Sequence, residues 1–580
     1  MTIAQQTGIR RELEAVHKTA GASLRPAVDW HSIDWRRASR HVRCLQRRIV
    51  QARQQGHKRK VRALQFILTR SYSARCLAVR RVTENSGKRT PGVDGELLNT
   101  PSKKARAVES LAAEDYQPQP LRRVFIPKQG GKKMRPLSIP TMQDRTRQAL
   151  HLLALDPIAE TTADPNSYGF RKARSVADAI VRCHNILSQS TSAPWILEGD
   201  IQSCFDAISH EWLLSHIPMD RAVLRKWLKA GVMEQRVHYP TSVGTPQGGI
   251  ISPVLMNLAL DGMERLLKTA FPQRSGKLVN LARFADDFVI TGRSKEILEN
   301  EVKPLITAFL KERGLQLSES KTRITHINDG FDFLGTHIRK YKGKCLTKPS
   351  RSNVRAFLAE IKTTFRENLH APVDVLIRRL NSKIRGWALF HRSSASKETF
   401  SYVDHEIFCH LKRWMLRRHR GWRRSWCYKK YLTRIGSRGY VLQSTYLDRR
   451  GKPHLIRLAN ASDIPIKRHI KVKAAANPYD STWEPYFEER LALQMKDSLQ
   501  GYKRLIKLWF DQNGRCPSCD EKISRETGWH LHHRIWIVNG GGDTLSNLSL
   551  MHPTCHQQLH AQIHRTNDPD CHTASAEAGV

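Results

Sequence analysis

The chain has 580 residues, more than the roughly 250 to 300 at which a single hydrophobic core stops growing, so several domains are expected. Its 97 Lys and Arg outnumber its 53 Asp and Glu, and the resulting net charge of +44 indicates a polyanionic partner such as nucleic acid or an anionic membrane surface. No run approaches the ~18 apolar residues of a membrane span, and the first thirty residues lack an apolar signal segment. The sequence therefore argues against membrane insertion and secretion, and favours the cytoplasm or an organelle interior.

The first predicted element is a basic amphipathic helix over residues 36–62. This stretch holds eleven Lys or Arg and no Asp or Glu, and Val42, Leu45 and Ile49 recur in it at helical spacing. Because like charges without counterions repel one another, we expect the helix to face a polyanion. A solvated charged face is the alternative interpretation.

A turn-rich break at residues 90–95 opens a long mixed region that reaches about residue 341. Helical stretches alternate there with four short β-type runs, at 121–127, 195–200, 278–285 and 288–291. This alternation is typical of an α/β or α+β domain.

A largely helical segment over residues 352–424 follows and ends in a basic cluster. Seven of the thirteen residues 412–424 are Lys or Arg, interleaved with Trp414 and Trp422, a composition suited to gripping phosphates while stacking on bases or sugars. Strand-like pieces continue to about residue 473. Acidic residues then gather after Asn477 and Pro478, which indicates a boundary, and the last module begins near residue 505.

Three aspartates are placed where phosphoryl-transfer chemistry needs them. Asp286 and Asp287 separate two apolar strands, and Asp200 ends another. Carboxylates in apolar surroundings are costly unless a cation binds them. Two-metal catalysis requires carboxylates from separate elements that hold ions about 3.5 to 4 Å apart. We expect Asp200 and Asp286 to form that pair, with a solvated hairpin tip as the alternative.

Two loops accompany these acids. Arg122, Lys128 and Arg135 lie in or beside a hairpin-like basic loop able to hold a triphosphate. Residues 244–253 are rich in glycine, which lets backbone come close to a ligand.

The C-terminal module presents two pairs of metal ligands with equal spacing. Cys516 and Cys519 form one pair, and His552 and Cys555 form the other. Three thiolates and one imidazole suit tetrahedral Zn²⁺, so we expect a structural zinc. A redox role for these cysteines is the alternative, but the βαβ context of such motifs is missing.

A histidine cluster lies inside this zinc frame. Asn547 follows His533 by fourteen residues, His556 follows nine later, and His560 four later again. His556 and His560 are one helical turn apart, so they can bind one ion from a single helix face. Phosphodiester cleavage needs one cation at the developing charge and one near-neutral base, which histidines supply.

The ordered motifs resemble the reverse-transcriptase core of group II intron-encoded proteins. That family has a basic fingers loop, an aspartate-bearing strand, a Pro-Gln-Gly block, an aromatic-Ala-Asp-Asp hairpin and a Phe-Leu-Gly turn. The matching residues here are the loop 122–136, Asp200, Pro246–Gly248, Phe284–Asp287 and Phe333–Gly335. Residues 90–95, 167–171 and 385–391 also look like pieces of that family, so the resemblance covers nearly the whole chain.

The resemblance implies that Asp200 and Asp286 bind catalytic Mg²⁺, with Asp287 beside them. One departure is Phe284, because the family usually has Tyr at that position. Loss of the hydroxyl leaves metal binding intact but alters the surroundings of the nucleotide, which bears on its selection or on fidelity.

The same resemblance implies a nucleotide site. Arg122, Lys128 and Arg135 are expected to contact the incoming triphosphate. Phe205, five residues after the first catalytic aspartate, is expected to exclude a ribose 2′-OH, with core packing as the alternative. Gln247 is expected to line the pocket.

The histidine spacings resemble the His-Asn-His (HNH) nuclease motif. This resemblance implies that His532, His556 and His560 bind a metal ion, that His533 is the general base, and that Asn547 braces the loop that orients it. Residues 535–539 depart from the pattern, because HNH modules commonly carry a Pro and basic residues there. Cleavage of DNA is therefore less firmly implied than the fold.

The implied fold is a multidomain α+β protein: a right-hand polymerase with fingers, palm and helical thumb, plus a small zinc-containing ββα-metal HNH module. The expected domains are an N-terminal basic extension, 1–89; fingers and palm, 90–345; a thumb or maturase (X) domain, 346–425; a DNA-binding region and linker, 426–500; and the HNH domain, 501–575.

The implied function combines an RNA-directed DNA polymerase, a splicing maturase and an HNH endonuclease in target-primed reverse transcription and retrohoming. Its expected partners are group II intron RNA, double-stranded target DNA and dNTPs, with no membrane, and its oligomeric state stays open. Mg²⁺ is expected at the polymerase and HNH sites. The alternatives are an RNA-binding splicing maturase without polymerase activity and another reverse-transcriptase system, such as a retron; the thumb and HNH tail favour the intron class.

Overall fold

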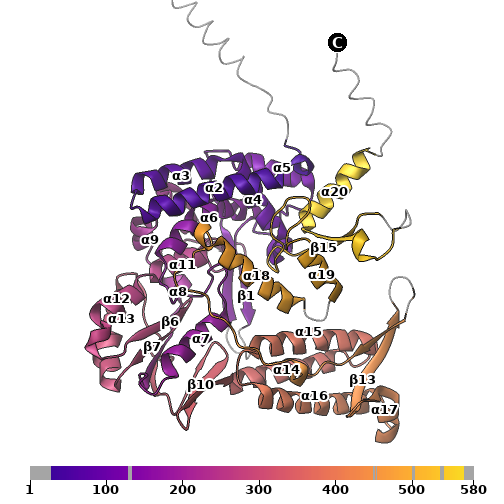
Figure 1. The fold of residues 1–580 in the computed structure, drawn as a ribbon. Coiled ribbons are helices and arrows are strands. Elements are labelled where there is room, and N and C mark those ends of the chain that lie inside the picture. Colours follow the sequence, from indigo (N-terminus) through magenta and orange to yellow (C-terminus); the bar gives the residue numbers. More distant parts are fainter. Residues whose placement is uncertain are drawn as a thin grey trace, which may run out of the picture. The chain divides into compact units, whose positions relative to one another are not determined.

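Figure 1 shows the fold as a computed structural model. The structure describes residues 28–127, 134–447, 451, 453–499, 503–535 and 541–566. These residues fall into two compact units, the first drawn from 1–122, 139–158 and 479–580 and the second from 123–138 and 159–478. The last division lies at Pro478, beside the Asn477-Pro478 step. A mixed α/β organisation with several domains is therefore confirmed.

The first unit is mostly helical. Its elements are η1 (Trp30–Ser32), α2 (Trp35–Gln54), α3 (Lys58–Arg70), α4 (Tyr72–Glu84), η2 (Ser86–Arg89), α5 (Pro101–Ser110), part of α6 (Met142–Thr162), η6 (Ser481–Trp483), α18 (Glu484–Ser498), α19 (Lys503–Asp511), β15 (His530–His533), η8 (Leu545–Asn547), β16 (Leu548–Met551) and α20 (Pro553–Thr566). Helix α2 packs against α3 and α4, while α20 packs against α4 and η1.

The basic N-terminal segment forms two helices instead of one. The side chain of Asp34 caps α2 by accepting a hydrogen bond from the Arg37 N–H, and the stripe of Val42, Leu45 and Ile49 is buried. The expected single helix over 36–62 is wrong, because the chain turns at Gly56, whose φ of +75° is left-handed and suits glycine.

The second unit is a mixed α/β structure built around several antiparallel sheets. Its elements are β1 (Leu121–Pro127, shared with the first unit), β2 (Met134–Ile139), α7 (Val176–Leu187), β3 (Trp195–Gly199), α8 (Cys204–Ala207), α9 (His210–His216), α10 (Arg221–Leu228), β4 (Val232–Glu234), β5 (Val237–Tyr239), α11 (Ser252–Leu260), α12 (Met263–Ala270), η3 (Gln273–Ser275), β6 (Asn280–Phe284), β7 (Asp287–Gly292), η4 (Ile297–Val302), α13 (Lys303–Lys311), β8 (Arg323–His326), β9 (Phe331–Phe333), β10 (Thr336–Tyr341), β11 (Lys344–Pro349), α14 (Arg351–Glu367), α15 (Val373–His391), α16 (Lys397–Arg418), α17 (Arg424–Tyr431), β12 (Leu432–Ile435), β13 (Arg438–Leu447), β14 (Pro453–Arg457) and η5 (Ala461–Asp463).

The sheet β6-β7-β3-β8 lies at the centre of this unit. Strand β3 pairs antiparallel with β7 on one side and β8 on the other, and β6 pairs with β7 across a hairpin. Ile196 and Leu197 of β3 are fully buried, as are Val289 and Ile290 of β7. Helix α7 packs against β6, and η4 packs against β3 and β7. The four expected β-type runs are confirmed as β1, β3, β6 and β7.

The helical segment after β11 forms a bundle of α14, α15 and α16 (Figure 1). Its apolar core includes Phe357, Ile361, Leu380 and Phe400 from these helices. The same core extends to Leu442 on β13, so the sheet β12-β13-β14 packs onto the bundle instead of standing apart. The predicted helical segment 352–424 is thus confirmed.

Within the part of the chain that the structure describes, no helix combines the length and apolar character that crossing a membrane requires.

Candidate active sites

Three aspartates gather beside the central strand of the second unit. Asp200 follows β3, while Asp286 and Asp287 lie at the tip of the β6–β7 hairpin. In the antiparallel β3–β7 pair, Gly199 lies opposite Phe288. Because Asp200 and Asp287 each adjoin one member of that pair, strand register brings the two acids together.

Burial and mutual repulsion make these carboxyl groups hard to ionise. Burial, with the charges of Asp286 and Asp200 and a hydrogen bond to Asp200, raises the pKa of Asp287 to about 7. Burial also raises the pKa of Asp286. Clustered acids of this kind suit a hard divalent cation, which favours their ionised forms.

Lys321 is a neighbour of this cluster that sequence reasoning missed. Its Nζ donates a hydrogen bond to Oδ2 of Asp200 at 2.7 Å. The lysine side chain is 66% exposed, so the ion pair is weak and leaves Asp200 available to a metal ion. The only sequence signal was a lysine in the turn before β8, which is too common to single out.

A buried arginine supports the aspartate hairpin. Arg283 is fully buried in β6, where its guanidinium forms an ion pair with Asp261 and donates to the carbonyl of Ala285 at 3.3 Å. Ala285 turns the hairpin with a left-handed φ of +60°. The signal for Arg283 was a charged residue inside an apolar strand, and sequence reasoning did not use it.

The segment Ser167–Arg171 packs against the same hairpin. The Tyr168 N–H donates to the carbonyl of Arg283 at 2.9 Å. A Cβ added at Gly169 would lie 2.3 Å from the backbone nitrogen of Ala285, so only glycine fits there. This segment therefore fixes the position of the hairpin turn that carries Asp286 and Asp287.

Three predicted nucleotide residues, Phe205, Gln247 and Arg135, belong to the second unit. Phe205 is half-buried, and its ring meets Phe170 edge to face with 6.3 Å between centroids. The carbonyl of Gln247 accepts a hydrogen bond from the Ser138 N–H of β2 at 2.6 Å. Arg135 lies exposed on β2, and its charge acts on Asp286 by lowering that group's pKa against the effect of burial.

The other two predicted nucleotide residues do not belong to the described part of the second unit. Arg122 lies on β1 and belongs to the first unit. Lys128 lies outside the described residues.

The glycines of the 244–249 loop make close approaches to protein backbone. Gly244 has φ +85°, and a Cβ there would lie 2.6 Å from the carbonyl oxygen of Asp206. Gly248 has φ +117°, and its Cβ would lie 2.9 Å from the carbonyl oxygen of Ser138. At these two positions glycine is required by another segment of the unit, and the approach of a ligand to this loop stays a prediction.

The two cysteine-containing pairs of the first unit form one buried cluster. The ligand atoms of Cys516, Cys519, His552 and Cys555 all lie within 4.8 Å of one another. Hydrogen bonds from the neighbouring thiols lower the pKa of Cys516, which favours a thiolate. The Nε2 of His552 lies 3.2 Å from the carbonyl of Lys522, so its Nδ1 is directed towards the cysteines. Three sulfurs and one imidazole in this arrangement fit tetrahedral Zn²⁺.

Three histidines form a second cluster in the same unit. His532 lies on β15, while His556 and His560 lie one turn apart on α20, and their ligand atoms also lie within 4.8 Å of one another. Burial, with the neighbouring histidines, lowers the pKa of His556 to about 4, and burial lowers that of His532. Neutral imidazoles are the form that binds metal ions, so these residues fit a divalent cation.

His533 follows His532 and has a different environment. Its Nε2 lies 2.8 Å from a carboxylate oxygen of Asp543, a contact that sequence reasoning missed although the residue ends the Gly-rich stretch before Asn547. Asn547 holds the intervening loop at both ends: its Oδ1 accepts from the Ile535 N–H at 2.7 Å, and its Nδ2 donates to the carbonyls of Ile535 and Gly542. Residues 536–540 of this loop lie outside the described residues.

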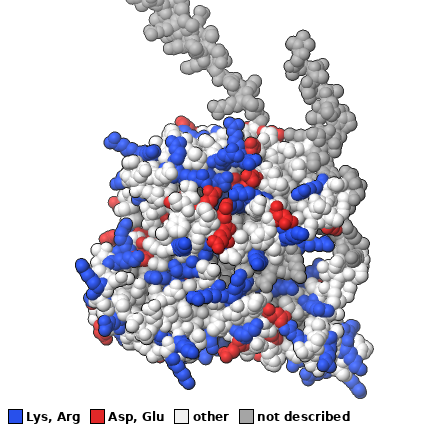
Figure 2. All heavy atoms as spheres, viewed as in Figure 1, with Lys and Arg blue, Asp and Glu red and all other residues white. Residues whose placement is uncertain are grey.

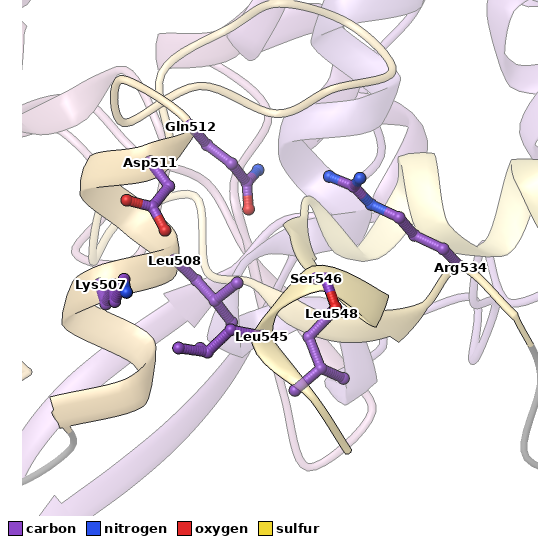
Figure 3. Close-up of a pocket in the computed structure, with 8 residues that line it drawn as sticks. All are labelled: Lys507, Leu508, Asp511, Gln512, Arg534, Leu545, Ser546 and Leu548. Carbon is purple, nitrogen blue, oxygen red and sulfur yellow. The ribbon is translucent and has the colours of Figure 1, made fainter. Parts of the chain in front are cut away.

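A cavity of about 240 Å³ lies beside strands β15 and β16 of the first unit (Figure 3). Its lining residues are Lys507, Leu508, Asp511, Gln512, Arg534, Leu545, Ser546 and Leu548. The close-up shows Arg534 and Gln512 extending towards each other above three leucines. None of the clustered histidines lines this cavity, so the candidate metal site is a separate feature of the module.

Lys and Arg side chains spread over much of the face that Figure 2 shows. Several arginines of the basic helix α2, however, form ion pairs within the protein. Three of them pair with acids of the same unit: Arg36 with Asp520 at 3.1 Å, Arg43 with Glu521 at 2.8 Å and Arg47 with Glu484 at 2.7 Å. These three arginines therefore have internal partners that composition did not predict, and their contact with a polyanion stays a prediction.

The two tryptophans of the basic cluster also differ. Trp414 is 2% exposed and packs in the core of the helical bundle, so the expectation that it stacks on nucleic acid is wrong. Trp422 is 55% exposed and stacks on Trp426 with 4.3 Å between ring centroids. It remains available as a stacking surface next to exposed arginines.

Comparison with protein families gives four matches along the chain. Residues 30–111 match the N-terminal domain of reverse transcriptase, and residues 126–338 match reverse transcriptase (RNA-dependent DNA polymerase). Residues 354–432 match the group II intron, maturase-specific domain, and residues 516–562 match HNH endonuclease.

Curated relatives agree with these matches. Protein YkfC of Escherichia coli is 34% identical over 314 residues, covering 46% of this chain and 80% of that protein. The group II intron-encoded protein LtrA of Lactococcus lactis is 27% identical over 391 residues, 56% of this chain and 63% of LtrA. Maturase-like protein 1 of Euglena gracilis is 26% identical over 371 residues, 62% of this chain and 77% of that protein.

Asp287 is predicted to make the protein less stable as pH rises when no Mg²⁺ is added. Its pKa is raised from 3.8 to about 7 in the folded protein. Between those values the folded state holds a proton that the unfolded chain has released, so stability falls as pH rises through this window. Asp287→Asn should make this fall shallower, and the part that remains belongs to other groups with a raised pKa, such as Asp286. Thermal unfolding from about pH 5 to about pH 8 measures it. The exposed Asp329→Asn should behave as wild type, and a wild-type curve parallel to that of Asp287→Asn would contradict the assignment.

Gly169→Ala is predicted to destabilise the second unit, because its new methyl group would meet the Ala285 backbone. Overpacking of this kind costs about 1 to 3 kcal/mol. Gly386→Ala on α15 is the matched control: a Cβ there meets nothing within 4 Å, so that change should be neutral or stabilise by roughly 0.5 to 1 kcal/mol. Denaturant unfolding compares the two, and equal stabilities would show that the close approach is not required.

Proposed function

Because the chain belongs to the group II intron-encoded reverse transcriptases and maturases with an HNH endonuclease domain, we propose that it performs target-primed reverse transcription. In this reaction the endonuclease nicks target DNA, and the polymerase extends the exposed 3′-OH along intron RNA. The observation that supports the proposal most is the strand register that sets Asp200 beside Asp286 and Asp287. Such a cluster has no structural use without a cation, because its members repel one another.

In the proposed polymerase site, Asp200 and Asp286 bind Mg²⁺ and Asp287 adds a third carboxylate to the hairpin. The metal supplies activation of the primer hydroxyl and stabilisation of charge on the phosphates. Lys321 releases Asp200 when the metal binds, since its exposed ion pair is weak. Arg283 supports the hairpin and so keeps the carboxylates of Asp286 and Asp287 in place. Next to them, Phe284 stands where the family usually has Tyr.

The incoming dNTP is proposed to lie against the residues around this hairpin. Phe205 presents a half-buried ring that excludes a 2′-OH by steric contact. Gln247 lines the pocket, held by its backbone contact to β2. Arg122, Lys128 and Arg135 bind the triphosphate through charge-assisted hydrogen bonds.

In the proposed endonuclease site, His532, His556 and His560 hold a divalent cation, Mg²⁺ or a transition ion, that stabilises charge on the cleaved phosphodiester. His533 accepts a proton from the attacking water. Asp543 fixes the orientation of the His533 ring, and Asn547 fixes the loop between them. Strands β15 and β16 followed by α20 are the parts of a ββα-metal module.

The Cys516, Cys519, His552 and Cys555 cluster is proposed to hold a structural Zn²⁺. Binding of zinc by such sets stabilises small modules by on the order of 10 kcal/mol. Because a module this small has a small apolar core, we expect its folding to depend on the metal.

The bundle of α14 to α16 is proposed as the thumb and maturase domain, which binds intron RNA. We divide the chain as the sequence suggests: 1–89 extension, 90–345 fingers and palm, 346–425 thumb, 426–500 DNA-binding region and linker, and 501–575 HNH domain. The shared core of the bundle and the β12-β13-β14 sheet supports a DNA-binding region that rests on the thumb.

The two active sites are predicted to fail independently. Asp286→Asn should abolish primer extension on an RNA template with Mg²⁺ and dNTPs while leaving DNA nicking intact. His533→Ala should slow nicking by about 10²- to 10⁴-fold, as loss of a general base does, and leave primer extension unchanged. If folded wild type extends no primer even with its intron RNA, the protein is an RNA-binding splicing maturase without polymerase activity.

Asn547→Ala is predicted to slow nicking through loss of loop geometry. The variant loses three hydrogen bonds to the loop, each contributing roughly 0.5 to 1.5 kcal/mol. Zinc content and primer extension should stay at wild-type values. The exposed neighbour Ser546→Ala serves as the control, and nicking at the same rate in both variants would refute a bracing role for Asn547.

A further inference from the structure

The zinc cluster has a neighbour from a distant part of the chain. Arg80 lies on α4, among the N-terminal helices, yet its guanidinium Nη2 lies 3.8 Å from Sγ of Cys555 and donates a hydrogen bond to it. Arg80 is 7% exposed. A buried guanidinium is costly unless anions surround it, so its position needs an explanation.

The surroundings of Arg80 fix its orientation. Its Nε donates to Glu84 at 3.1 Å, one turn later on α4. Its Cζ lies over the ring of Trp35, 4.9 Å from the ring centroid. The carboxylate of Glu84 therefore holds Nε and the aromatic ring holds the guanidinium carbon, while Nη2 donates to the sulfur of Cys555.

Charge explains why a thiolate is the second partner. Zn²⁺ bound by three thiolates and a neutral imidazole carries a net charge of −1, and the four ligands are buried. Glu84 neutralises part of the arginine's charge, but Glu84 is itself within the field of Lys104. Negative and positive charges therefore alternate from the zinc cluster outward, and their attraction offsets part of the free-energy cost of burying the cluster.

Further contacts join the same helices to the zinc module on both sides of the cluster. Asp520 and Glu521, which follow the Cys516–Cys519 pair directly, form the ion pairs with Arg36 and Arg43 of α2. On α20, three residues after Cys555, Gln558 donates to the carbonyls of His31 and Ile33 at 2.5 and 3.0 Å. The module is thus docked at the cluster itself.

We propose that Arg80 is an outer-sphere partner of the zinc cluster, so that the N-terminal helices of the reverse transcriptase complete the metal site of the endonuclease module. Zinc binding and docking of the module onto these helices are then linked, each strengthening the other. This inference rests on the zinc cluster proposed above. Arg80 acts through Cys555 and is a positioning residue.

The test measures zinc affinity of the full chain by competition with a chelator. Arg80→Gln should weaken zinc binding by about 10- to 100-fold, the usual effect of removing an outer-sphere partner. Arg80→Lys keeps the charge but loses the fork, so its loss should be smaller. Arg81→Gln, an exposed change on the same helix, should bind zinc as wild type does.

A second readout separates an electrostatic role from simple packing. With Co²⁺ in place of zinc, the thiolate-to-cobalt absorption band reports on hydrogen bonds to sulfur. Loss of the Arg80 donor should shift this band to lower energy in Arg80→Gln, since the sulfur electrons are then held less tightly, while Arg81→Gln should leave it in place. If Arg80→Gln does not fold, Arg80→Lys carries both measurements.

The outcomes distinguish the two proposals. Wild type without stoichiometric zinc would overturn the zinc cluster and, with it, the role of Arg80. Wild type with one zinc, but with affinity and cobalt spectrum unchanged in the Arg80 variants, would overturn the inference alone. That result would leave Arg80 as a helix residue paired with Glu84.

Discussion

Clusters of buried side chains that can bind metal ions are the constraint on which both units of this protein depend. In the second unit, strand register gathers Asp200, Asp286 and Asp287 where burial raises the pKa of Asp287 to about 7, because ionised carboxylates repel one another. In the first unit there are two separate clusters, three cysteines with His552 and a set of three histidines, and the ligand atoms of each lie within 4.8 Å of one another. Both kinds of cluster suit a divalent cation, which is the occupant proposed for each.

The rest of each unit keeps these groups at fixed positions. Around the aspartates, the buried Arg283 and the close contact of Gly169 with Ala285 fix the position of the hairpin. Around the histidines, Asn547 ties together the ends of a loop, and Asp543 contacts His533, which follows the clustered His532. Preorganisation of this kind is what phosphoryl transfer and phosphodiester cleavage require, because the protein contributes position and charge while the metal contributes activation. The N-terminal helices extend the same principle, through Arg80, to the cysteine-histidine cluster that is proposed to bind zinc.

Local patterns in the sequence were enough to locate the strands around Asp200 and the hairpin, since short apolar runs bounded by polar residues predict buried strands. They also grouped the cysteines and histidines correctly as neighbours, because ligands three or four residues apart lie close together in a tight turn or on one face of a helix. Sequence failed where the partner is distant in the chain. Arg80 lies 475 residues from Cys555, and Lys321 lies 121 residues from Asp200, so no spacing rule connects either pair. It failed again for Trp414 and the α2 arginines, because composition alone does not tell a core face or an internal ion pair from a nucleic-acid surface.

In the proposed reaction the two active sites act in series on one DNA strand. The most direct measurement is sequencing of the products after the protein, bound to its intron RNA, is incubated with dNTPs and a plasmid that carries the uninterrupted insertion site. The account predicts cDNA joined covalently to the 3′ end of the nicked plasmid strand, at a single position. cDNA that accumulates without such junctions, or junctions that form equally on a plasmid lacking the site, would contradict it.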